Sequence, residues 1–120
     1  MSDRANQERD FVRFAHAAYE VAQQMLPRYS HPKSPHRFTF PQLAACVLLN
    51  LDLRVSYRDM EEWLQAHEPV RAALELRQVP DHSTLDRAHQ RLIRMGVLET
   101  LQRTVAQRLG TPEQAPDATP

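Results

Sequence analysis

The sequence predicts an all-α protein: one small domain of five to six helices followed by a disordered C-terminal tail. Apolar residues recur at spacings of three and four along most of the chain, which is the period of a helix face, and no stretch alternates as a strand would. Residues that start and stop helices separate these stretches. With 120 residues, of which 42% are apolar, the chain can bury one modest core.

The first expected helix covers roughly residues 7–26 and defines an N-terminal unit of residues 1–27 that Pro27 ends. Its apolar stripe consists of Phe11, Phe14, Ala15, Ala18, Ala22 and Met25. Residues 28–38 follow as a proline-rich linker that contains Arg28, Lys33 and Arg37 and no acid. We expect this linker to be extended and basic.

A helical domain is predicted over residues 39–109, and its first helix begins at Thr39. Gln42 stands three residues after this threonine and Pro41 lies in the first turn, the arrangement of a capping box. The body of the helix, LAACVLLNLDL, is apolar on almost every side. We therefore expect it to be the central helix of the core.

Two shorter helices are expected next. The first begins at Ser56, with Asp59 three residues later, as at a helix cap. Its buried residues are Tyr57, Met60, Trp63 and Leu64. The second covers roughly residues 69–76, begins near Pro69, and buries Val70, Ala73 and Leu74.

The last two helices are separated by Gly96, which is expected to end the first of them in a left-handed conformation. Pro80 breaks the chain before that helix, and either Asp81 or Ser83 caps it. The final helix buries Leu98, Leu101, Val105 and Leu109. Residues 110–120 contain three prolines and little apolar surface, which predicts disorder.

The helix after Pro80 divides into two faces when its residues are placed at about 100° per residue. Leu85, Ala88, Leu92 and Met95 share one face, with His89 at its edge. Thr84, Arg87, Arg91 and Arg94 share the neighbouring face, and the amides of Ser83 and Thr84 are expected to be free. Such a helix has the chemistry to enter a major groove, since arginine binds phosphate or guanine. The alternative is an ordinary solvated face, where arginines complement the helix dipole.

Charge is distributed unevenly along this neutral chain. Residues 28–58 contain five basic residues against Asp52 alone, whereas residues 59–75 contain five acids against Arg71 alone. A basic side can bind a phosphate backbone locally, although few contacts give weak, salt-sensitive binding. The acidic side would be repelled by DNA and faces a partner protein or, alternatively, only solvent.

Two motifs occur in the order that is found in a known protein family, and this order indicates a function. The run FTFPQLAACVLLNLDLRVSYRDMEEWLQ, followed by VPDHSTLDRAHQRL, resembles the N-terminal helical region of bacterial insertion-sequence transposases, the DDE enzymes of the insertion-sequence-five type. The motifs cover about half of the chain. The resemblance implies recognition of DNA at transposon terminal repeats, with the helix from Ser83 facing the DNA.

Matching the motifs residue by residue points to positions 56–59 and to Pro80–Leu85 with Arg87, several of which have evident structural roles as caps or core residues. The expected DNA-binding set is Ser83, Thr84, Arg87, Gln90, Arg91, Arg94, Arg58, Lys33 and Arg37. The chain departs from the family at Ala88 and His89, where an aromatic and a basic residue are frequent. The connection over residues 77–82 is also longer than a tight turn, so any helix-turn-helix unit is a loose one.

The catalytic part of the family is not represented in this sequence. The family's chemistry requires three carboxylates on a separate α/β domain, where they hold two divalent metals. We therefore expect no catalysis, and interpret the chain as a truncated or split transposase fragment. Two alternatives stay open: a helical interaction module that uses Phe11 and the stripe of residues 98–109 to pair with a copy or with a full-length transposase, or a decayed remnant without a selected role.

No cofactor or metal site is predicted. Cys46 is the only cysteine, so no internal disulfide is possible, and its apolar neighbours predict an inert thiol in a reducing cytoplasm. His31, His36, His82 and His89 lack zinc-ligand spacing. The two glycines form no phosphate-binding loop. The polar N-terminus does not resemble a signal peptide, and the apolar run 43–49 is too short to cross a membrane, so a membrane partner is not expected.

Overall fold

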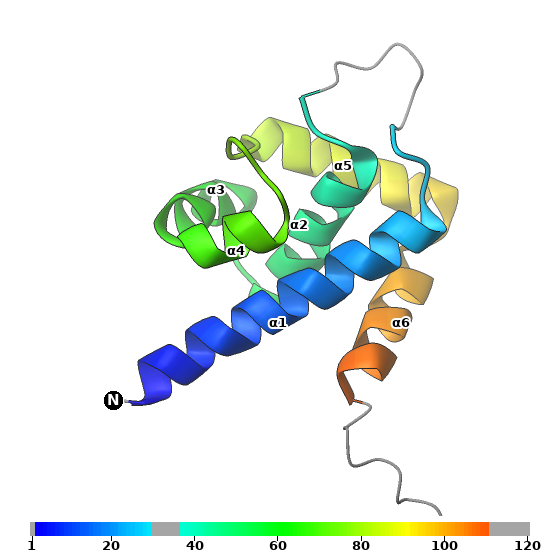
Figure 1. The fold of residues 1–120 in the computed structure, drawn as a ribbon. Coiled ribbons are helices and arrows are strands. Elements are labelled where there is room, and N and C mark those ends of the chain that lie inside the picture. The colour runs from blue at the N-terminus through cyan, green and yellow to red at the C-terminus, as the bar shows by residue number, and fades with distance from the viewer. Residues whose placement is uncertain (1, 30–36, 111–120) are drawn as a thin grey trace, which may run out of the picture.

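The computed structural model describes residues 2–29 and 37–110, where all regular secondary structure is α-helical and no strand occurs (Figure 1). The predicted all-α fold is confirmed. In chain order the helices are α1 (Ser2–Met25), α2 (Phe40–Leu53), α3 (Tyr57–Ala66), α4 (Glu68–Ala73), α5 (His82–Met95) and α6 (Leu98–Gly110). Of the tail expected to be disordered, residues 111–120 lie outside the described residues, and Gly110 ends α6.

Helix α2 is the centre of the domain, as its sequence predicts. The capping box at its start is present, because the Thr39 side chain accepts from the Gln42 amide and the Gln42 side chain accepts from the Thr39 amide. Every residue from Ala44 to Asn50 is buried. Helix α1 packs along one side of α2 and α5 packs on another, while α6 packs against α1 (Figure 1).

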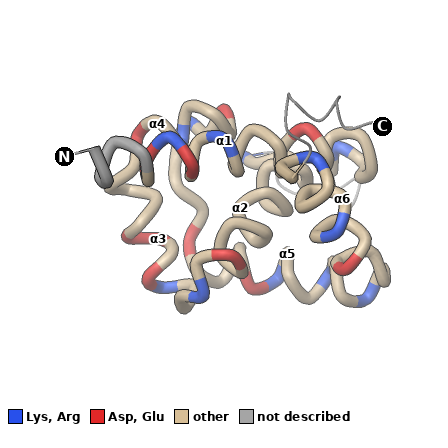
Figure 2. Tube along the Cα trace, turned by 90° about the horizontal axis from the view of Figure 1, so that it is seen from below, with Lys and Arg blue, Asp and Glu red and all other residues tan. Residues whose placement is uncertain are grey.

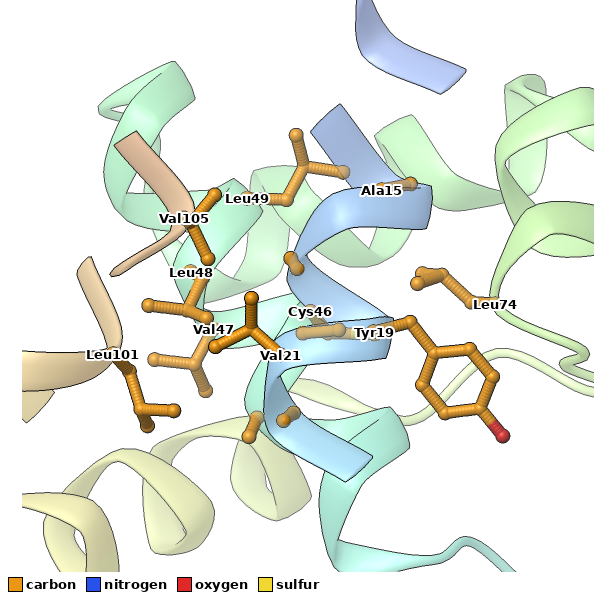
Figure 3. Packing of buried hydrophobic residues seen from close by; sticks show 14 of the residues in the cluster. Ala15, Tyr19, Val21, Cys46, Val47, Leu48, Leu49, Leu74, Leu101 and Val105 are labelled. Atoms are coloured by element: carbon orange, nitrogen blue, oxygen red, sulfur yellow. The ribbon is translucent and has the colours of Figure 1, made fainter. Parts of the chain in front are cut away.

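The core joins residues that are far apart in the sequence. Figure 3 shows Val47 and Leu48 of α2 beside Leu101 and Val105 of α6, with Val21 of α1 over them. All five are buried. Because these apolar side chains leave water together, their burial holds α1, α2 and α6 as one unit.

Three of the predicted helix boundaries or faces are wrong in detail. Helix α1 begins at Ser2, not near residue 7. Met25 and Met95, expected on buried stripes, are 39% and 38% exposed. Each lies at the last residue of its helix, where the core has ended. An apolar residue just beyond the helix, Leu26 or Val97, packs against the core instead.

Helix α4 is shorter than predicted, ending at Ala73 instead of near residue 76. Leu74 is buried, but Glu75 takes a positive φ of 57°, which stops the helix. The Leu76 amide donates to the Arg71 carbonyl at 2.9 Å, and the Glu75 amide donates to the Ala72 carbonyl at 3.0 Å. This tight end turns the chain toward α5.

Gln42 joins the start of α2 to the end of α4. Its Oε1 accepts from the Thr39 amide at 2.8 Å, and its Nε2 donates to the carbonyls of Leu74 and Glu75 at 3.1 and 2.9 Å. The side chain is only 8% exposed. All three hydrogen bonds therefore form where water gives little competition, and they fix one segment of the chain against another.

The thiol of Cys46 provides a pH-dependent test of the core. Complete burial in α2 raises the pKa of Cys46 from 9.0 to about 12, so the folded protein keeps a proton that the unfolded chain loses. The contribution to stability is present below pH 9 and is lost as the pH rises toward 12. Between pH 8 and 10, wild type should lose about 1 kcal/mol more unfolding free energy than Cys46→Ala in urea titrations. Parallel losses in the two proteins would contradict the burial of this thiol.

No helix among the described residues combines the length and the apolar character needed to span a bilayer.

Candidate nucleic-acid interface

A groove of about 580 Å³ lies between α5 and the segment that leads into α2. Four arginines from these two parts of the chain line it, together with aromatic and apolar residues. We call it the arginine groove, and its lining residues are Tyr29, Arg37, Phe38, Phe40, Leu43, Asp81, Thr84, Arg87, Ala88, Arg91 and Arg94. Five of the nine residues expected to bind DNA therefore meet in one place.

The position of α5 follows from its ends and its apolar face. Of the two caps that the sequence allows, Asp81 is the one used: its Oδ1 accepts from the Thr84 amide at 2.8 Å. This hydrogen bond lowers the pKa of the Asp81 carboxyl. Gly96 ends the helix with a φ of 70°, as predicted. Leu85 and Leu92 are fully buried, which anchors the helix on α2.

One expectation about the start of α5 is wrong. The amide of Thr84 was expected to be free for a ligand, but it donates to Asp81. The Asp81 side chain satisfies this donor because aspartate before a helix hydrogen-bonds the amide three residues later. The donors that the groove offers to a ligand are therefore its arginine side chains and not this amide.

The electrostatics of the groove favour an anion. Arg37, Arg87 and Arg94 are exposed, and Arg91 is half-buried. Within the described part of the chain, no carboxylate pairs with Arg37, Arg87 or Arg94 as a salt bridge, and Asp81 is the one acid in the lining. The Arg87 guanidinium donates to the Thr84 hydroxyl at 3.5 Å. Positive charge is thus concentrated in a hollow, where it attracts anions more strongly than on a flat surface.

The other predicted DNA-binding residues do not reach the groove. Ser83 and Arg58 line a separate hollow of about 300 Å³ between the starts of α3 and α5. Gln90 is exposed on α5 and lines neither hollow. Lys33 lies outside the described residues. The structure therefore separates the eight described members of the predicted set into five in the groove, Ser83 and Arg58 in the second hollow, and Gln90 elsewhere on α5.

The aromatic part of the lining was not predicted. Tyr29, Phe38 and Phe40 lie beside the arginines, although neither composition nor helix periodicity marks them as site residues. The available signal is the run RFTF, in which Arg37 and Phe38 directly precede the capping residue Thr39 and Phe40 follows it. Phe40 is 2% exposed and belongs to the core, whereas Phe38 and Tyr29 are half-buried.

Helix α3 braces α5 from the side away from the groove. Glu61 Oε1 lies 3.3 Å from His82 Nδ1 and accepts from the His82 amide at 3.2 Å. The Tyr57 hydroxyl is hydrogen-bonded to His89. Acidic positions gather along α3 and basic positions recur along α5 in Figure 2.

Two of the five acids in residues 59–75 have structural partners. Glu61 contacts His82, and Glu75 accepts from the Tyr19 hydroxyl at 3.2 Å. The side chains of Asp59, Glu62 and Glu68 are exposed. The acidic side is therefore in part an internal brace and in part a solvated surface.

The apolar surfaces considered for pairing with another chain are used inside the domain. Phe11 packs edge-on against Trp63 with ring centroids 5.1 Å apart. Leu101 and Val105 are buried, and Leu98 and Leu109 pack against the same core. Intramolecular contacts therefore bury Leu101 and Val105 and cover Phe11, Leu98 and Leu109 in part.

A metal site is not found among the described residues, where no three His, Cys, Asp or Glu side chains gather. Cys46 is buried within α2.

Comparison with known proteins gave no match to a family model, to a curated protein or to a solved structure.

Proposed function

We propose that this chain is a DNA-binding module that holds phosphates in the arginine groove, and that it corresponds to the end-recognition region of an insertion-sequence transposase. The observation that carries the proposal is the convergence of Arg37 with Arg87, Arg91 and Arg94 from a distant part of the sequence. An arginine row on one helix is common on protein surfaces. Two segments that bring arginines to one hollow are a more selective feature.

The chemistry of the groove suits a phosphodiester backbone. Guanidinium groups form paired hydrogen bonds with phosphate oxygens and keep their charge at every physiological pH. Binding releases counterions from the DNA, which makes the affinity fall steeply with salt. A neutral protein gains no long-range attraction to DNA, so the local charge of the groove must supply it.

The resemblance to transposases supports the proposal through the residues that build α5. In the motif PDHSTL, Pro80 is buried, Asp81 caps the helix and Leu85 is core, so the motif fixes where the arginine row begins. In the motif SYRD, Ser56 caps α3 through the Asp59 amide at 3.0 Å. The resemblance adds two points to this proposal: the DNA is that of transposon terminal repeats, and the chain has no catalytic role.

The test is binding of a fluorescent 20-base-pair duplex to wild type and to the double variant Arg87→Ala/Arg91→Ala, followed by anisotropy at low and moderate salt. Loss of two charge-assisted contacts should weaken binding about 10- to 100-fold at low salt. The slope of log affinity against log salt should become shallower by about 2, since each phosphate contact contributes about 0.9.

Two controls make this result specific. Arg9→Ala/Arg103→Ala removes the same charge at exposed positions outside the groove and should change affinity less than threefold. Asp81→Asn should tighten binding, because asparagine retains the helix cap and removes the acid of the lining. Absence of binding at low salt, or equal losses in both double variants, would reject the proposal.

A further inference from the structure

We infer that the arginine groove accepts an unpaired strand of DNA, with its phosphates on the arginines and a base against Phe38. This inference rests on the proposed function and specifies the form of DNA that enters the same groove. It differs from the expectation that α5 inserts into a major groove.

The direction of Arg91 favours a ligand that enters the groove. Leu85 and Leu92 are buried, and on a helix of 100° per residue the opposite side of α5 is formed by Ser83, Gln90 and Arg94. Arg87 and Arg91 lie between this outer side and the buried face, turned toward the groove. A duplex resting on the outer side of α5 would meet Arg94, Ser83 and Gln90, whereas Arg91 is reached by a ligand that enters the groove.

The shape of the groove gives the same answer. A helix that reads a duplex must protrude into a major groove about 12 Å wide. Here the segment at Phe38 and Leu43 forms a wall opposite the arginines of α5. The groove volume of about 580 Å³ is typical of pockets that take in a small molecular group. One nucleotide of a single strand can enter such a hollow, and its base then lies beside the aromatic residues of the lining.

The lining combines the two features that bind single strands. Arginines track the backbone, and aromatic rings stack with bases that have lost their neighbours. Phe38 and Tyr29 are half-buried beside Arg37, and Leu43 and Ala88 add apolar surface. In a duplex the faces of the bases are already stacked on one another. Only an unpaired base has a face to offer to Phe38.

The experiment compares fluorescent dT20, rU20 and a 20-base-pair duplex on the full chain, together with a 20-mer of abasic deoxyribose phosphates. The abasic strand keeps the charge and removes the bases, so it tests stacking on the unmodified protein. We expect dT20 to bind at least fivefold more tightly than either the duplex or the abasic strand. Phe38→Leu should weaken dT20 binding about tenfold and leave duplex binding unchanged, while Phe38→Trp should retain it. Thermal unfolding by circular dichroism verifies that both variants fold.

The outcomes separate this inference from the proposed function. Equal binding of dT20, duplex and abasic strand, all weakened by Arg87→Ala/Arg91→Ala, overturns the unpaired strand and leaves DNA binding in place. Tighter binding of the duplex than of dT20 also overturns the unpaired strand and leaves DNA binding in place. Preference for rU20 over dT20 overturns the choice of DNA. If no nucleic acid binds at low salt, both statements fail.

Discussion

Replacing Gln42 with leucine is expected to lower the free energy of unfolding by about 3 kcal/mol. Leucine has a similar volume, so the change removes hydrogen bonds without leaving a large hole. The Thr39 amide loses its acceptor, and the carbonyls of Leu74 and Glu75 lose their donor. Each buried polar group left without a partner costs about 1 to 3 kcal/mol, and the Leu74 carbonyl is the most deeply buried of the three. Urea unfolding followed by circular dichroism measures the loss.

Two further variants identify its origin. Gln42→Glu keeps the acceptor for Thr39 but places a carboxylate against two carbonyls, so it should also destabilise. Gln65→Leu makes the same chemical change at an exposed position of α3 and should shift stability by less than about 0.5 kcal/mol. If Gln42→Leu proved as mild as Gln65→Leu, the link between α2 and the end of α4 would not matter for stability.

The neighbouring residues Leu92 and Ile93 of α5 should respond very differently to alanine. Leu92 is 0% exposed, whereas Ile93 is 50% exposed. Leu92→Ala removes buried methyl groups and leaves a cavity, which should cost about 3 kcal/mol. Ile93→Ala removes surface that water already reaches and should cost well under 1 kcal/mol. Denaturant titration of both variants tests the orientation of the helix on which the arginine row depends, and a reversed order would mean that α5 is rotated.

Much of the fold could be predicted because local signals agree with tertiary packing. The caps at Thr39 and Ser56 and the stop at Gly96 involve residues within four positions of one another, so the sequence contains everything that defines them. The apolar run of α2 marks a helix surrounded on all sides. The errors at Met25 and Met95 arose because a helical stripe does not reveal where the core around it ends.

Only one wall of the groove, the arginines of α5, was predicted from the sequence. The arginines of α5 share a helical face, which spacing reveals, and Arg37 was selected for its charge. That Phe38 and Leu43 stand opposite Arg91 depends on how α2 packs against α5, a contact between residues about 50 positions apart. No local pattern encodes such a distance. Asp81 was recognised as a cap, but its place among the arginines follows only from the fold.

Because α2 is buried at the centre of the domain, the arginine groove forms and is lost together with the fold. One wall of the groove is formed by the first turn of α2 and the residues just before it. The other wall is α5, which packs against α2 through the buried side chains of Leu85 and Leu92. Amides in the middle of α2 can exchange hydrogen with solvent only when the domain opens as a whole. The arginine groove therefore exists only in the folded domain: a peptide copied from α5 alone would possess the charges but no hollow, and partial unfolding would abolish the groove together with its support.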